Sequence, residues 1–129
     1  MDMTKEMIEI NVPLSFTQER ISDLLCSAFE GGSNYWYEIV RYKFAKGKAG
    51  SDYKYKHIEV PFDGGAIIIC DKEDPTTQAK LDKAAIVKGL ELMADKYPDH
   101  FKDWVDENAD AETGDVFLQL CLFNEIVFG

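Results

Sequence analysis

Two groups of side chains have the types and spacing that a binding site requires: an aromatic, basic segment and a run of acids. The stretch from Glu38 to Val60 carries six basic and three acidic side chains. The stretch from Glu91 to Asp115 carries nine acidic and two basic ones, in a chain of net charge −10. Surfaces of opposite charge attract different partners. The sequence therefore offers two candidate binding surfaces.

The acidic segment could imitate the regular charges of a nucleic-acid backbone. Carboxylates spread over helices in this way could occupy the basic groove of a nucleic-acid-binding protein. We predict a partner protein with a basic surface; a solvated helical surface is the simpler alternative and stays open. The candidate partner-binding residues are Glu91, Asp95, Asp99, Asp103, Asp106, Asp110, Glu112 and Asp115.

The aromatic segment suggests a different ligand. Tyr35, Trp36 and Tyr37 could stack on bases, while Arg41 and Lys43 could neutralise phosphates, as a nucleotide or a single strand requires. Alternating aromatics in a strand also fill cores, and lysines also protect sheet edges, so both interpretations stay open. The net charge of −10 argues against duplex nucleic acid.

No group of residues predicts a catalytic or a metal site. A calcium loop starting at Asp106 would have Ala111 where glycine is needed and Phe117 where a bidentate acid is needed. His57 and His100 lie in no recognised catalytic motif. An enzyme that uses carboxylates with either histidine is therefore our third hypothesis, and we expect no cofactor.

The length and composition favour a single domain covering residues 1–129. The longest apolar run, Ala66 to Cys70, is far shorter than the roughly 20 residues of a membrane span, so we expect no membrane partner. The first residues lack a secretory signal, which makes the cytoplasm the expected location. Cys26, Cys70 and Cys121 each have apolar neighbours and are expected to be buried free thiols.

The first half of the chain predicts a strand, a helix and a hairpin. Met7 to Val12 alternates apolar and polar residues, as a strand does. Ser15 should cap a helix from about Phe16 to Glu30, which Gly31-Gly32 should end in a left-handed conformation. Tyr35 to Phe44 and Tyr53 to Val60 are rich in aromatic and β-branched residues.

These two runs predict a β-hairpin with a mobile loop over Ala45 to Asp52. The unbroken apolar run from Ala66 to Cys70 predicts a central strand buried on both faces.

The second half predicts helices. Apolar residues from Leu81 to Met93 have helical spacing, and Pro98 should close that helix. A short helix is expected from His100 to Glu107, followed by a helix capped by Thr113. The apolar end, Ile126 to Phe128, should dock on the core. The predicted fold class is α+β, with three or four antiparallel strands packed against three or four helices.

Three segments also resemble a set of small, mostly uncharacterised bacteriophage and prophage proteins. They are Phe29 to Trp36 (FEGGSNYW), Ala109 to Gln119 (ADAETGDVFLQ) and Phe123 to Gly129 (FNEIVFG), where the relatives would have glycine at Asn124. The resemblance implies a mobile-element accessory protein. Many small acidic proteins of that origin inhibit host defences, including anti-CRISPR proteins and restriction inhibitors.

By this analogy we expect a non-enzymatic inhibitor that binds a host nucleic-acid-handling protein in the host cytoplasm through its acidic surface. The alternative is a nucleotide-binding module that sequesters a defence signal through the aromatic, basic segment.

Overall fold

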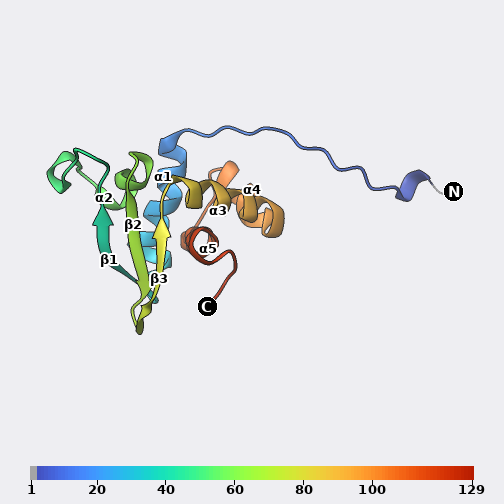
Figure 1. Ribbon diagram of the computed structural model, residues 1–129. Helices are drawn as coiled ribbons and strands as arrows, with labels where there is room; N and C mark the ends of the chain where they lie inside the picture. Colours follow the sequence, from blue (N-terminus) through green and yellow to red (C-terminus); the bar gives the residue numbers. More distant parts are fainter. Residues whose placement is uncertain (1–2) are drawn as a thin grey trace.

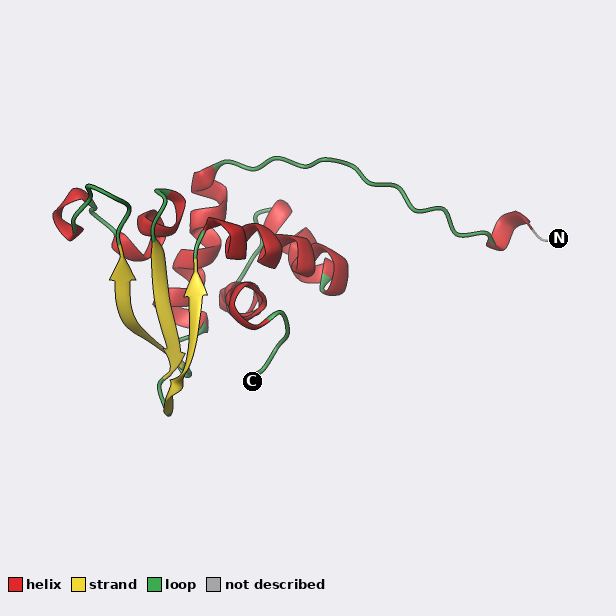
Figure 2. Cartoon of the chain, in the orientation of Figure 1, coloured by secondary structure: helices red, strands yellow, loops and turns green. Residues whose placement is uncertain are grey.

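The computed structural model describes residues 3–129 as a three-stranded antiparallel sheet with helices packed on one face (Figures 1 and 2). This arrangement confirms the predicted α+β class. The strands are β1 (Tyr37–Lys43), β2 (Ala66–Asp71) and β3 (Asp74–Leu81), in the order β1-β2-β3. The helices are α1 (Gln18–Ser27), α2 (Lys56–Glu59), α3 (Lys83–Lys96), α4 (Pro98–Val105) and α5 (Ala111–Phe123), with short turns at Met3–Lys5, Ala28–Gly32, Gly50–Asp52 and Val60–Phe62.

Strand β2 lies at the centre of the sheet and is buried on both faces, as predicted. Ile67 and Ile69 are fully buried in the core beneath the helices. Ile68 points to the other face, where its partners in register are Arg41 on β1 and Lys80 on β3. The apolar side chains of β2 are therefore buried on both faces of the sheet, which explains why this run does not alternate between apolar and polar residues.

Helix α5 is the most deeply buried element, with every residue from Thr113 to Cys121 buried. Close helix packing depends on two glycines. A Cβ at Gly114 would lie 2.8 Å from the backbone nitrogen of Ala28, and a Cβ at Gly89 would overlap Cys121. The apolar face of α1 completes this core, and Leu24 is 1% exposed there.

The predicted strand from Met7 to Val12 is wrong. The chain before α1 runs away from the body (Figure 1) and pairs with neither edge of the sheet, so its alternating pattern forms no ladder. The helix also begins later than predicted. Thr17, not Ser15, is the N-cap, because its hydroxyl accepts a hydrogen bond of 3.2 Å from the Arg20 backbone N–H.

The end of α1 differs from the predicted left-handed glycine cap. The chain continues through a π turn, Ala28–Gly32, and neither Gly31 nor Gly32 has a positive φ. Gly32 is required for a different reason. A Cβ at this position would overlap the carbonyl oxygen of Ala111, where α5 begins.

The predicted hairpin between Tyr35–Phe44 and Tyr53–Val60 is also wrong. Strand β1 pairs with β2, and the residues between them form an irregular connection that contains α2. Phe44 stacks on Tyr42 and Tyr53 at centroid distances of 6.1 and 5.8 Å, so these aromatics pack on one another instead of alternating across a sheet. The third strand, β3, was not predicted.

The C-terminal helices lie close to their predicted positions. Pro98 occupies the first turn of α4, directly after α3. Helix α5 is capped by Asp110 and not by Thr113, whose backbone N–H donates a 2.9 Å hydrogen bond to the Asp110 carboxylate. None of the helices described for residues 3–129 combines the length and the hydropathy that a bilayer-spanning helix requires.

The prediction of buried thiols is right for two of the three cysteines. Cys70 and Cys121 are buried, and all three thiols are free. Cys26 is only half-buried on α1, where its Sγ donates a hydrogen bond to Glu30. Its apolar sequence neighbours belong to the adjacent face of the helix, which packs inward.

Candidate functional site

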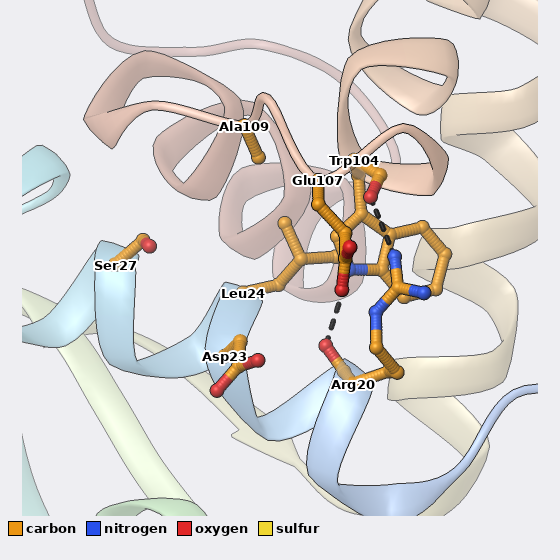
Figure 3. A pocket seen from close by; sticks show the side chains of 7 residues that line it. All are labelled: Arg20, Asp23, Leu24, Ser27, Trp104, Glu107 and Ala109. Carbon is orange, nitrogen blue, oxygen red and sulfur yellow. Dashed lines mark hydrogen bonds between the residues drawn. The ribbon is translucent and has the colours of Figure 1, made fainter.

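A groove lies between α1 and the connection from α4 to α5 (Figure 3). It consists of two depressions, of about 210 and 550 Å³, that share Asp23, Ser27 and Ala109. We call it the acidic groove. The other residues that line it are Arg20, Leu24, Cys26, Glu30, Gly31, Trp104, Glu107, Asp110 and Ala111.

Arg20 and Trp104 join the two walls of the acidic groove. The Arg20 guanidinium donates to the carbonyl oxygens of Trp104 at 2.6 Å and of Val105 at 3.4 Å, at the C-terminal end of α4. In return, the Trp104 indole N–H donates to the Arg20 carbonyl oxygen at 3.1 Å. A cation is favourable beside the last carbonyls of a helix. The only arginine or lysine of the groove is therefore bound to backbone oxygens (Figure 3).

Four carboxylates line the same groove: Asp23, Glu30, Glu107 and Asp110. Hydrogen bonds from Cys26 and then from His57 lower the pKa of Glu30. The backbone N–H of Thr113 lowers the pKa of Asp110.

Both of these carboxylates are therefore ionised at neutral pH. Asp23 and Glu107 have no ion pair within residues 3–129. The groove can accept a cationic group from a partner.

Glu107 has a backbone conformation that is rare for glutamate. Its φ is +62°, in the left-handed region, two residues after the end of α4. The backbone N–H of Asn108 closes the helix end with a 2.7 Å hydrogen bond to the Asp103 carbonyl oxygen. Glycine is the usual residue at such a left-handed helix end, and asparagine is the next most common. A glutamate here adds a carboxylate to the lining of the groove (Figure 3).

The predicted acidic residues divide into an exposed set and one buried residue. Seven of them are exposed on α3, α4, the α4–α5 connection and the start of α5: Glu91, Asp95, Asp99, Asp103, Asp106, Asp110 and Glu112. Asp106 is paired with Lys102 at 2.8 Å. Asp115 is only 8% exposed, so its inclusion in a partner-binding surface was wrong.

The buried Asp115 carboxylate accepts hydrogen bonds from three side chains of the segment after α1. Its Oδ1 accepts from Ser33 at 2.7 Å and from the Trp36 indole at 2.8 Å. Its Oδ2 accepts from the Tyr35 hydroxyl at 2.6 Å. Burial, and then the hydrogen bond to Asp115, raise the pKa of Tyr35 to about 12. This arrangement holds a loop against α5 and gives both carboxylate oxygens hydrogen-bond donors within the fold.

One helical turn later, Gln119 holds the C-terminal segment. Its Oε1 accepts from the backbone N–H groups of Val127 and Phe128, both at 2.8 Å. The Phe128 ring stacks on Trp36 at 4.7 Å. The predicted docking of the C-terminal segment is thus confirmed. The segments Phe29–Trp36, Ala109–Gln119 and Phe123–Gly129 therefore meet around Asp115 and Gln119.

The predicted nucleotide site is not assembled as expected. Trp36 is 2% exposed, so its ring offers no face to a base. Tyr37 is half-buried, with its ring 5.2 Å from that of Phe29 and its hydroxyl donating to the Phe29 carbonyl oxygen at 2.6 Å. Tyr35 is half-exposed but bound to Asp115. Arg41 and Lys43 are exposed on β1.

A different aromatic group lies nearby, in the stack of Tyr42, Phe44 and Tyr53. The Lys56 ammonium lies 5.8 Å from the Tyr42 ring centre. Sequence reasoning missed this stack because it assigned Tyr53 to a strand.

The two histidines lie apart from each other. His57 contacts Glu30 at 3.4 Å, and the Nδ1 of His100 lies 2.8 Å from the Thr113 hydroxyl. No group of three or more metal-ligating side chains is placed to hold an ion in the part of the chain that the structure describes. No family model, curated protein or solved structure with which the chain was compared matches it significantly.

Proposed function

We propose that this chain is a non-enzymatic binding module whose acidic groove takes a lysine or arginine side chain from a basic surface of a partner protein. The resemblance to phage and prophage proteins extends the proposal to the class of partner. That partner is a host nucleic-acid-handling protein in the host cytoplasm, and the effect of binding is to inhibit a host defence. An anti-CRISPR or restriction-inhibitor role would have this form.

The conformation of Glu107 is the observation that carries the proposal. A left-handed conformation costs a residue with a Cβ about 1 kcal/mol or more, whereas glycine adopts it freely. A costly conformation that places a charged group in a groove is typical of a functional position. Stability alone favours glycine here, so the carboxylate of Glu107 is best explained by binding.

The charges around Glu107 support a cationic ligand. Asp23 shares the first depression with Glu107, and Glu30 and Asp110 line the second. Two opposite charges 4 Å apart attract by about 1 kcal/mol in water and by about 4 kcal/mol at the lower dielectric near a protein surface. Exposed acids on α3 and α4 add a long-range field that speeds the encounter with a basic partner.

The decisive variant is Glu107→Gly, because it separates stability from binding. We expect its free energy of unfolding in urea to rise by about 1 kcal/mol, since the strained residue is removed. Its affinity for a fluorescent arginine-rich peptide should fall at least about threefold at low ionic strength, since one close charge pair is lost. Fluorescence polarisation measures that affinity.

Two charge-neutralising variants provide the matched control. Glu107→Gln keeps the backbone strain and removes the carboxylate, whereas Glu91→Gln removes an exposed carboxylate on α3, outside the groove. We expect the peptide to bind Glu107→Gln more weakly than Glu91→Gln. Equal affinities would show that only net charge matters, and the groove proposal would then fail.

A second candidate function rests on the stack of Tyr42, Phe44 and Tyr53 with Lys56. Aromatic rings beside a lysine can bind the base and phosphate of a nucleotide. Native mass spectrometry of freshly purified protein would detect a retained nucleotide. Binding there should be lost in Phe44→Ala with Lys56→Ala and unchanged in Glu107→Gln, so the two functions are experimentally separable.

A further inference from the structure

We propose that the acidic groove recognises an extended segment of the partner protein in which a basic and an apolar residue lie two positions apart. The basic side chain binds in the groove, and the apolar side chain binds in a neighbouring depression beside the C-terminal segment. Such a segment is recognised only if the groove takes a basic side chain, so the inference rests on the proposed function.

The neighbouring depression has a volume of about 490 Å³ and lies between α5 and the C-terminal segment. We call it the C-terminal pocket. Its apolar lining comes from Val116 on α5 and from Ile126 and Phe128 in the C-terminal segment. The last two side chains are half-buried, so part of each is open to a ligand.

Contacts within the fold hold the walls of the C-terminal pocket. The Gln119 Oε1 accepts from the backbone N–H groups of Val127 and Phe128, both at 2.8 Å. The Phe128 ring stacks on the buried Trp36 ring at 4.7 Å. A ligand therefore finds these walls already ordered and loses less binding free energy in ordering them.

The boundary between the acidic groove and the C-terminal pocket consists of small residues. Gly31 lines the groove, Gly32 lines the pocket and Ala111 lines both. The two chain segments touch at this boundary, because a Cβ at Gly32 would overlap the carbonyl oxygen of Ala111. With only a methyl group among these three residues, an extended backbone can pass from one depression to the other.

Charge complementarity selects the basic residue of the segment. Asp23, Glu30 and Asp110 line the second depression of the groove, and Glu112 and Asp115 line the C-terminal pocket. Within residues 3–129, no lysine or arginine lines either of these two depressions. A segment that carries a positive charge is attracted to this surface, whereas an acidic segment is repelled.

The polar groups of the C-terminal pocket favour an apolar side chain beside them. Both Asp115 carboxylate oxygens have donors within the fold. The Gln119 Oε1 has two donors, and its Nε2 donates to the Phe128 carbonyl oxygen at 3.2 Å. An apolar side chain can therefore enter without leaving either buried group unpaired, and burying it is favourable.

The spacing of the two side chains follows from α5, because residues at its start line both depressions. Asp110 and Ala111 line the groove, whereas the part of α5 that lines the C-terminal pocket runs from Ala111 to Gln119, with Asp115 at its centre. From Asp110 to Asp115 is about 7.5 Å along a helix. Side chains two positions apart in an extended chain lie on the same side, about 6.6 Å from each other.

Other spacings fit less well. Adjacent side chains of an extended chain point to opposite sides, and side chains four positions apart are separated by about 13 Å. The geometry therefore selects a spacing of two positions.

Peptides of matched composition test this spacing on the unchanged protein. Each fluorescent peptide has three arginines, five positions apart and separated by serines. The spaced peptide has leucines two positions before and two positions after the middle arginine, and the adjacent peptide has them directly beside it. The serine peptide has serine in place of both leucines. Because leucines flank the arginine on both sides, the test does not depend on the direction in which the segment runs.

Fluorescence polarisation distinguishes the outcomes. We expect the spaced peptide to bind at least about fivefold more tightly than the serine peptide, because one leucine becomes partly buried. The adjacent peptide should bind within about twofold of the serine peptide. Equal affinities of the spaced and adjacent peptides would overturn the proposal, as would a spaced peptide that binds no more tightly than the serine peptide.

Two variants test where the leucine binds. Ile126→Thr makes a wall of the C-terminal pocket less apolar, whereas Val127→Thr makes a similar change at the next residue, which is 53% exposed and does not line the pocket. The gain from the leucines should fall to about twofold or less in Ile126→Thr and remain in Val127→Thr, with unchanged circular dichroism in both. Equal gains in the two variants would overturn the proposal, and the peptide comparison on the unchanged chain requires neither variant to fold.

The serine peptide separates this inference from the proposed function. If that peptide binds and loses affinity in Glu107→Gln while the leucines add nothing, the inference fails and the proposed function stands. If none of the three peptides binds, both fail.

Discussion

A carboxylate has one of two roles in this protein, according to whether water reaches it. Glu107 is exposed and is held at the groove by an unfavourable backbone conformation. Asp115 is buried, and all its close polar contacts are donors from Ser33, Tyr35 and Trp36. The sequence shows the residue type in both cases but not the burial. Only the three donors, brought together from about 80 positions away along the chain, reveal that Asp115 is structural.

Replacing Asp115 by alanine should destabilise the fold strongly. Ser33 and Trp36 are almost fully buried, so each would keep a donor without an acceptor, at a cost of about 1–3 kcal/mol per group. We expect the free energy of unfolding in urea to fall by about 2–5 kcal/mol. Glu91→Ala, at an exposed position, should change it by less than about 0.5 kcal/mol. A loss below 1 kcal/mol for Asp115→Ala would contradict the structural role.

At the scale of elements, the sequence predicts the helices better than the strands. The amphipathic spacing of α1 and α3 directly reflects burial of one face, so these helices could be located. Strand β3 could not, because an edge strand such as DPTTQAKL is mostly exposed and has no apolar alternation. Conversely, the alternation at Met7 to Val12 is strong, but pairing depends on a neighbour that the sequence does not specify.

The adjacent glycines after α1 test the packing between elements. Gly32→Ala should lower the free energy of unfolding by about 1–3 kcal/mol, because its Cβ would overlap the backbone of Ala111 and the backbone cannot give way cheaply. Gly31→Ala should be neutral or slightly stabilising, since its Cβ would lie 4.0 Å from the Ala111 side chain. Thermal or urea unfolding measures both. Equal effects would show that α1 and α5 pack less tightly than described.

At the scale of the whole molecule, the acidic segment of the sequence is mostly exposed on the fold, as predicted. The carboxylates that line the groove, however, come partly from other parts of the chain. The exposed acids of α3 and α4 were predicted, whereas Asp23 on α1 and Glu30 in the π turn after α1 were not, because they lie outside the acidic segment of the sequence. Asp23 lines the same depression as Glu107, and the walls of that depression are joined by the contact of Arg20 with Trp104, 84 residues apart. A contact at such a distance leaves no local pattern in the sequence, so the groove could not be predicted.

The Cys26–Glu30 hydrogen bond has a consequence for covalent labelling. That hydrogen bond, followed by burial, raises the pKa of Cys26 to about 11. Burial also raises the pKa of Cys70 and of Cys121. At neutral pH only about one Cys26 thiol in ten thousand is then the reactive thiolate. Iodoacetamide should modify the native chain slowly and all three cysteines rapidly in denaturant, which mass spectrometry can follow. Glu30→Gln should accelerate labelling at Cys26 alone. Alkylation of the wild-type protein would then report global unfolding, whereas alkylation of Cys26 in the variant would report the loss of a single local contact.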